Sequence, residues 1–215
     1  MKRIVSSFFA LMMAFSLCVP ALAADSLEKI NDYTAGQFAD VSEDLWCADN
    51  IRTAYEFGLM GGVSDTYFDV DSSLTVAQTI VMACRLHSIY TEDHAEFSQA
   101  TPWYQPYLDY AAEAGILWEF YDYNAPVTRA DFAVILSGSL PEEALPAIND
   151  IADGAIPDVP EDLYGAEAVY RLYRAGILTG NDAYGTFTPN SAITRGAAAA
   201  LVSRMADPSL RKSFT

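Results

Sequence analysis

The stretch PVTRADFAVIL, residues 126–136, places an arginine between a threonine and an apolar run, in a strongly acidic chain. The same step occurs in AITRGAAAALV, residues 192–202, and SLTVAQTIVMA, residues 73–83, repeats it with valine in place of arginine. Three copies of one pattern indicate an internal repeat, in which each copy forms one supersecondary unit.

A second spacing brings the three copies into register. In each unit an aromatic residue is followed twelve positions later by a glycine, and the pairs are Trp46 and Gly58, Trp103 and Gly115, and Tyr164 and Gly176. From glycine to threonine the gap is 17, 13 and 18 residues, so the length varies within one loop, where insertions are tolerated.

The segment between aromatic residue and glycine has helical periodicity. In the third unit Val169, Leu172, Tyr173 and Ile177 fall on one helix face, and Gly176 suits the left-handed conformation that ends a helix. The other two units place similar residues at the same positions. We therefore expect a first helix in each unit that ends at the glycine.

A second helix is expected to begin at each threonine. The hydroxyl can accept a hydrogen bond from an unpaired backbone N–H, and a polar residue three positions on can reach back. Thr75 with Gln78 and Thr128 with Asp131 fit this capping box, whereas Thr194 has Ala197 there and makes only half of it. One helix-loop-helix unit is too small to bury its apolar faces, so three must pack together into a mainly α fold.

The N-terminus is typical of a secretory signal. Lys2 and Arg3 precede an apolar segment that ends at Pro20 and Ala21-Leu22-Ala23, which predicts cleavage before Ala24. On length alone a membrane span is the alternative. Cleavage leaves an exported chain and changes the net charge from −17 to −19, which disfavours nucleic acid and anionic membrane surfaces as partners.

Two cysteines, Cys47 and Cys84, remain in the exported chain. They could pair in an oxidising compartment, or stay free and buried, and the sequence leaves both alternatives open.

In these positions the chain resembles the S-layer homology (SLH) domain family. The first unit carries the family's residues as Phe38-Ala39-Asp40-Val41, Trp46, Gly58-Leu59, Gly62, Phe68 and Leu74-Thr75-Val76-Ala77-Gln78. The third carries Pro157-Asp158-Val159, Tyr164, Gly176-Ile177, Gly180, Gly185, Phe187-Thr188-Pro189 and Ile193-Thr194-Arg195-Gly196-Ala197. The second has a degraded start, Phe97-Ser98-Gln99-Ala100, but keeps Trp103, Gly115-Ile116 and Val127-Thr128-Arg129-Ala130-Asp131.

The resemblance implies a pseudo-threefold assembly of three repeats around a central helical bundle. Its implied boundaries are a signal peptide at 1–23, a linker at 24–37, repeats at 38–90, 91–145 and 146–207, and a C-terminal tail at 208–215. The implied function is non-covalent attachment to the bacterial envelope through an anionic wall polysaccharide that often carries pyruvylated sugars. The residues implied to contact this ligand, in grooves between repeats, are Arg129, Arg195, Asp40, Trp46, Trp103 and Asp158.

Physical reasoning supports the binding of an anion by Arg129 and Arg195. Arg129 and Arg195 occupy the first turn of a helix, where we expect unpaired N–H groups and a positive dipole end. The guanidinium adds a planar fork that matches a carboxylate. The alternative is a surface side chain or an ion pair to a nearby aspartate. Val76 removes the cation from the first unit, so we expect that groove to be weak or empty.

The surrounding residues also have structural interpretations. Trp46 and Trp103 are expected to anchor the core, and sugar stacking is the alternative. Asp40 and Asp158 could cap the first helices or brace a turn as readily as contact a ligand. Tyr164, where the family has tryptophan, weakens the transfer of a ligand role to its groove.

The sequence contains no recognisable catalytic motif, and we expect neither enzymatic activity nor a cofactor or metal. We predict a secreted module at the cell wall or cell surface that binds an anionic wall glycan without inserting in a membrane. The alternative is a protein-interaction scaffold of the same fold, which binds other envelope proteins and no glycan.

Overall fold

A computed structural model describes residues 27–91, 95–117 and 122–214, and the predicted signal segment 1–23 lies outside them. The described residues form helices α1 (Ala48–Glu56), α2 (Val76–Tyr90), α3 (Gln105–Glu113), α4 (Arg129–Gly138), α5 (Ala166–Arg174) and α6 (Arg195–Ala206), with 3-10 helices η1 (Glu142–Ala144) and η2 (Pro208–Leu210). In these ranges the only β pairing consists of isolated bridges. The expected mainly α fold is confirmed.

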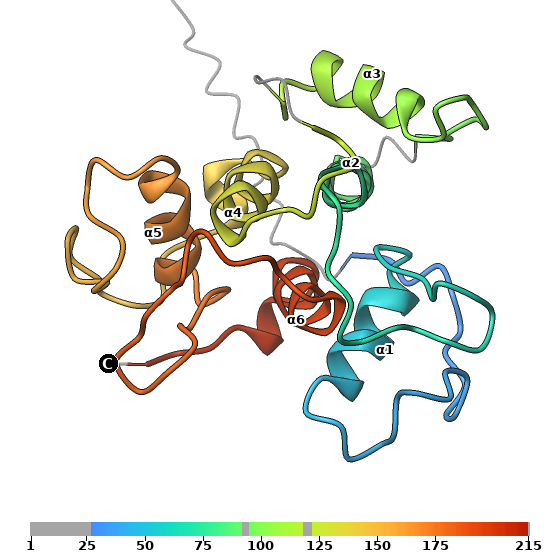
Figure 1. Cartoon of the computed structure of the whole chain (residues 1–215), viewed down its shortest axis with the longest axis horizontal. Helices are drawn as coiled ribbons and strands as arrows, with labels where there is room; N and C mark the ends of the chain where they lie inside the picture. The colour runs from blue at the N-terminus through green and yellow to red at the C-terminus, as the bar shows by residue number, and fades with distance from the viewer. Residues whose placement is uncertain (1–26, 92–94, 118–121, 215) are drawn as a thin grey trace, which may run out of the picture.

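The helices form three pairs that are consecutive in the chain, α1 with α2, α3 with α4 and α5 with α6, and the pairs are arranged around a centre. In Figure 1, α2, α4 and α6 are seen nearly end-on in the middle, while α1, α3 and α5 lie outside them. Helix α3 packs on α2, α5 on α4 and α1 on α6. Each first helix therefore packs on the second helix of the preceding pair, and α1 closes the circle by packing on α6. We refer to the three contacts as the α2–α3, α4–α5 and α6–α1 junctions.

A ring of backbone hydrogen bonds joins the three pairs at the residue before each threonine. Val127 N–H donates to Leu74 C=O at 2.9 Å, Leu74 N–H donates to Ile193 C=O at 3.1 Å, and Ile193 N–H donates to Val127 C=O at 3.3 Å. Each residue donates once and accepts once within the ring. This closed cycle gives the fold its pseudo-threefold centre and sets the second helices side by side.

The expected helix ends are confirmed. Gly58, Gly115 and Gly176 end the first helices with φ values of 68°, 70° and 72°, in the left-handed region that glycine enters without steric strain. Thr75 and Gln78 form the full capping box. Thr194 accepts only from Ala197 N–H, at 3.3 Å, as expected for a half-made cap.

The cap of α4 differs from the expected capping box. Thr128 Oγ1 accepts from Asp131 N–H at 3.1 Å, as expected. The Asp131 carboxylate, however, accepts from the Thr128 hydroxyl at 2.6 Å instead of reaching back to the Thr128 N–H. Aspartate is one methylene shorter than the Glu or Gln of a capping box, which accounts for the shorter reach.

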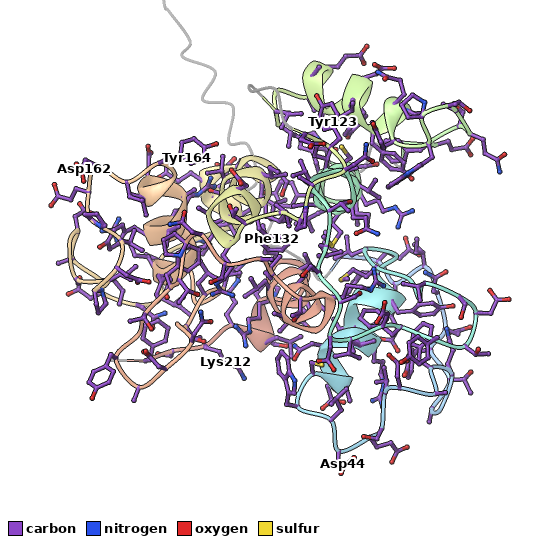
Figure 2. All side chains as sticks on the ribbon, viewed as in Figure 1. Asp44, Tyr123, Phe132, Asp162, Tyr164 and Lys212 are labelled. Atoms are coloured by element: carbon purple, nitrogen blue, oxygen red, sulfur yellow. The ribbon has the colours of Figure 1, made fainter. Side chains whose placement is uncertain are left out.

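One continuous apolar core fills the space between the central helices. Phe132 of α4 is 1% exposed and lies near the middle of the assembly (Figure 2). Other large, fully buried side chains come from all three pairs, among them Phe38, Phe68, Ile80, Ile135, Tyr170 and Phe187. None of the helices in the described ranges is both long and apolar enough to span a bilayer.

Cys47 and Cys84 are both free and buried, so the pairing alternative is wrong. Burial raises the pKa of the Cys47 thiol to about 11 and that of Cys84 to about 12. Cys84 Sγ also donates to the Tyr107 carbonyl, a contact between α2 and α3. Both thiols act as small apolar groups at junctions between helix pairs.

Candidate functional site

The predicted site residues lie at the three junctions, in sets that the structure assembles across helix pairs. At the α4–α5 junction, Arg129 begins α4, and Tyr164 directly precedes the N-cap residue of α5, Gly165. A Cβ placed on Gly165 would lie 2.7 Å from Val134 and 3.7 Å from Ala130, so this corner of α5 is tight against the first turns of α4. Figure 2 shows Tyr164 between the ribbons of α4 and α5.

Arg129 reaches from α4 to the loop that leads into α6. Its Nε donates to Phe187 C=O at 2.7 Å, and its guanidinium carbon lies 4.9 Å from the centre of the Phe187 ring. Within the described ranges, neither Nη1 nor Nη2 has a hydrogen-bond partner. Burial lowers the pKa of Arg129, and the nearby Tyr173 and Asp158 act in the opposite direction. The open side of the fork is thus free to bind an acceptor.

Arg195 occupies the equivalent position at the α6–α1 junction but is more enclosed. Its Nε donates to Phe68 C=O at 2.8 Å and its Nη2 to Gly61 C=O at 2.6 Å, while the guanidinium carbon lies 4.7 Å from the Phe68 ring centre. The residue is only 6% exposed. Burial lowers its pKa, and the charges of Asp69 and Asp40 act in the opposite direction. Only Nη1 is left without a partner in the described part of the chain.

Neither arginine follows the structural alternatives considered for it. Among the described residues neither forms an ion pair, and both are stacked on a phenylalanine ring instead of extending into solvent. Each cation joins the second helix of one pair to the loop of another. At the α2–α3 junction the corresponding residue is Val76, which is 4% exposed and provides no charge.

The N–H groups at the starts of α4 and α6 are not unpaired, and that expectation was wrong. Arg129 N–H donates to Ser191 C=O and Arg195 N–H to Ser72 C=O, each at 2.9 Å. The next residue of each helix is also paired with the neighbouring loop, Ala130 with Pro189 and Gly196 with Val70. The loop that crosses from another pair supplies these carbonyls, so an anion here would contact the arginine side chain and not the helix N-terminus.

Asp40 and Asp158 brace the loops on which the arginines stack. Asp40 accepts from the N–H groups of Phe68 at 2.8 Å, Asp69 at 2.7 Å and Val70 at 3.2 Å. Asp158 accepts from Phe187 at 2.7 Å and Thr188 at 2.6 Å.

Neither aspartate caps a first helix, so the turn-bracing interpretation is the one that the structure bears out. Burial alone would raise the pKa of Asp40, but its backbone hydrogen bonds outweigh this and the pKa is lowered.

The expectation that Trp46 and Trp103 anchor the core was wrong. Trp46 is 65% exposed, Trp103 53% and the corresponding Tyr164 47%. They directly precede α1, α3 and α5, which lie outside the central helices (Figure 1). Each junction therefore presents an aromatic ring to solvent.

A cavity of about 480 Å³ lies at the α4–α5 junction. It is bordered by the turn after α3, the C-terminal half of α4 and the start of α5, with Ile116, Ser137, Glu161, Tyr164 and Arg171 among its lining residues. Tyr164 lines this cavity, whereas Arg129 does not.

Sequence reasoning missed the phenylalanines that carry the arginines. Phe68 and Phe187 each precede the capping threonine of their unit by seven residues, a constant spacing that could have marked them. This spacing does not predict that each ring stacks on the arginine of a different helix pair.

Comparison with known proteins supports the assignment of two of the repeats. The family model described as "S-layer homology domain" matches residues 37–79 and 155–199, which include α1 and the start of α2, and α5 and the start of α6.

Three curated proteins are similar to the chain. The Surface-layer 125 kDa protein of Lysinibacillus sphaericus is 32% identical over 126 residues, 53% of this chain and 11% of that protein. A Cell surface protein of Thermoanaerobacter kivui is 28% identical over 120 residues, 55% of this chain and 15% of that protein. An Endoglucanase of Bacillus sp. (strain KSM-635) is 28% identical over 220 residues, 95% of this chain and 22% of that protein. The chain thus spans between about a tenth and a fifth of the length of these relatives.

Proposed function

We propose that this chain is an envelope-anchoring module of three S-layer homology repeats that binds an anionic cell-wall polysaccharide non-covalently, with the middle repeat at 91–145. The proposal extends to a location at the bacterial cell surface. It is supported by the family match to the first and third repeats and by the similarity to a surface-layer protein and a cell surface protein.

The observation that carries the proposal is the Arg129 fork. Its Nη1 and Nη2 lack partners among the described residues, while Nε and the stacked Phe187 ring hold its plane in place. A pre-positioned guanidinium is suited to bidentate contact with a carboxylate, such as that of a pyruvyl ketal. The exposed ring of Tyr164 would support a sugar at the same junction.

We propose no enzymatic activity for the chain. Its similarity to an endoglucanase covers 22% of that protein, and the same chain is also similar to proteins named for the cell surface. A shared envelope-binding portion accounts for both similarities without a shared reaction.

Sedimentation with isolated cell-wall sacculi tests the proposal. We expect the protein to sediment with native sacculi and to bind at least about tenfold more weakly when pyruvyl groups have been removed by mild acid. Arg129→Ala should release it from native sacculi. Sedimentation that is unaffected by removal of the pyruvyl groups would contradict a carboxylate as the recognised group.

A protein-interaction scaffold is the second candidate. It is favoured by Val76, which puts no cation directly after the capping threonine of α2, and by the exposed Trp103 at the α2–α3 junction. Retention by envelope proteins, together with no sedimentation with deproteinised sacculi, would support this candidate over glycan binding.

A further inference from the structure

Arg129 and Arg195, the two arginines that directly follow a capping threonine, differ in how many guanidinium N–H groups bond to the neighbouring loop. Arg195 gives Nε and Nη2 to the carbonyls of Phe68 and Gly61. Arg129 gives only Nε, to Phe187. Thr179 corresponds in position to Gly61, and no hydrogen bond joins it to Arg129 among the described residues. The two forks therefore have different numbers of N–H groups left for a ligand.

One residue of the neighbouring loop also differs between the two junctions. Asn181 and Val63 are equivalent, because each follows a glycine and each N–H donates at 2.8 Å across its own loop, to Thr186 and Tyr67. Asn181 Nδ2 donates to Phe187 C=O at 3.1 Å and to Thr188 Oγ1 at 2.6 Å. It thus shares the carbonyl that Arg129 uses. The side chain of Val63 has no polar group, so it makes no such hydrogen bond to the carbonyl of Phe68, which Arg195 uses.

A second difference concerns charge. Asp69 and Thr188 are equivalent, since each directly follows the stacked phenylalanine and has a positive φ, 64° and 56°. The negative charge of Asp69 acts on Arg195. Thr188 puts a neutral hydroxyl in the same place beside Arg129. Two carboxylates, Asp69 and Asp40, therefore act on Arg195, whereas one, Asp158, acts on Arg129, so a carboxylate bound at Arg195 would lie near one more negative charge.

We propose that the α4–α5 junction is the carboxylate-binding one, with Arg129 binding end-on through Nη1 and Nη2, and that Asn181 is a positioning residue that keeps this fork open. Arg195 is then a structural clamp. The inference rests on the proposed glycan-binding function and assigns it to a single junction.

The test compares variants in their affinity for native and pyruvyl-depleted sacculi. Wild type should prefer native sacculi at least tenfold, because charge-assisted hydrogen bonds are strong. Asn181→Val copies the residue of the first pair and should lower this preference toward that of Arg129→Ala, while binding to depleted sacculi stays unchanged. Asn181→His retains a donor and should restore most of the preference. A general loss of structure would reduce binding to both preparations alike.

A reciprocal variant tests the inference without relying on loss of function. In an Arg129→Ala background, Val63→Asn with Asp69→Thr should open the Arg195 fork and restore a preference for native sacculi. Arg195→Lys, which keeps the charge, should leave the wild-type preference within about twofold.

The outcomes separate this inference from the proposed function. An Asn181→Val protein with the full wild-type preference, or a loss with Arg195→Lys equal to that with Arg129→Ala, would overturn the assignment to one junction while glycan binding stands. A wild type that binds neither preparation would overturn both proposals.

Discussion

Arg195 and Phe68 are 127 residues apart in the chain, yet the Arg195 Nε–H donates to the Phe68 carbonyl at 2.8 Å. This contact joins the last helix pair to the first and closes the circle that begins with α1 packed on α6. Arg195, which the sequence suggests as a ligand contact, thus helps to join the last helix pair to the first.

Arg195→Ala should therefore destabilise the protein. It removes two hydrogen bonds and a stacked cation and leaves two loop carbonyls without partners, so we expect a loss of about 2–4 kcal/mol in the free energy of unfolding. Urea denaturation measures it. Arg52→Ala is the control, because Arg52 is exposed and pairs with Asp49 at 3.5 Å, and it should cost under about 1 kcal/mol. Equal losses for the two variants would contradict a clamping role.

Asp40→Asn should destabilise the protein in a way that depends on pH. The carboxylate accepts three backbone N–H groups, whereas an amide offers one oxygen, so we expect a loss of about 1–3 kcal/mol at pH 7. The folded pKa of Asp40 is lowered. Its stabilisation is therefore present above the ordinary value of about 4 and is lost as the pH falls through the folded pKa.

Unfolding of both proteins between pH 7 and pH 2.5 measures this dependence. The difference in stability between wild type and Asp40→Asn should shrink on acidification. Glu143→Gln, at an exposed position, serves as the control and should change little. A difference that stays constant down to pH 2.5 would show that the charge of Asp40 is not what the loop requires.

Asn149→Ala should loosen the C-terminal segment. Asn149 is 6% exposed, donates to Tyr173 C=O at 3.1 Å and Lys212 C=O at 3.0 Å, and accepts from Phe214 N–H at 2.8 Å. Removing these bonds should cost about 2–4 kcal/mol and speed hydrogen exchange at Phe214.

Asn31 is the matched control for this variant, because its position relative to α1 is equivalent to that of Asn149 relative to α5: their N–H groups donate to Glu56 C=O and Arg174 C=O. It donates to Tyr55 C=O at 2.9 Å, but in the described residues it makes no hydrogen bond to the C-terminal segment. Asn31→Ala should cost under about 1 kcal/mol. If both variants were equally destabilising, the tail contacts at Asn149 would contribute nothing measurable.

The local features could be predicted from the sequence. Gly58, Gly115 and Gly176 end helices because the left-handed conformation is open to glycine, and Thr75, Thr128 and Thr194 cap helices through hydroxyls within three residues of their donors. The repeat itself follows from spacing. These conclusions need no knowledge of which unit packs on which.

The candidate site was predicted less well. Its residues fall at the junctions, but the unpaired helix N-termini and the buried tryptophans were both wrong. The N–H groups of Arg129 and Arg195 are paired by loops from other helix pairs, and Trp46 and Trp103 lie before helices that occupy the outside of the assembly. Both outcomes depend on contacts between units that a spacing pattern does not contain.

The sequence by itself determined that there are helix-loop-helix units, where their helices begin and end, and that two of three copies carry an arginine after the capping threonine. Only the tertiary structure decided that each arginine stacks on the phenylalanine of another pair. Within the part of the chain that the structure describes, two guanidinium nitrogens of Arg129 and one of Arg195 have no partner. The physical reason is the range of the interactions. Caps and turns involve neighbours within a few residues, whereas the surroundings of a guanidinium depend on whichever loop the closed circle of helices brings against it.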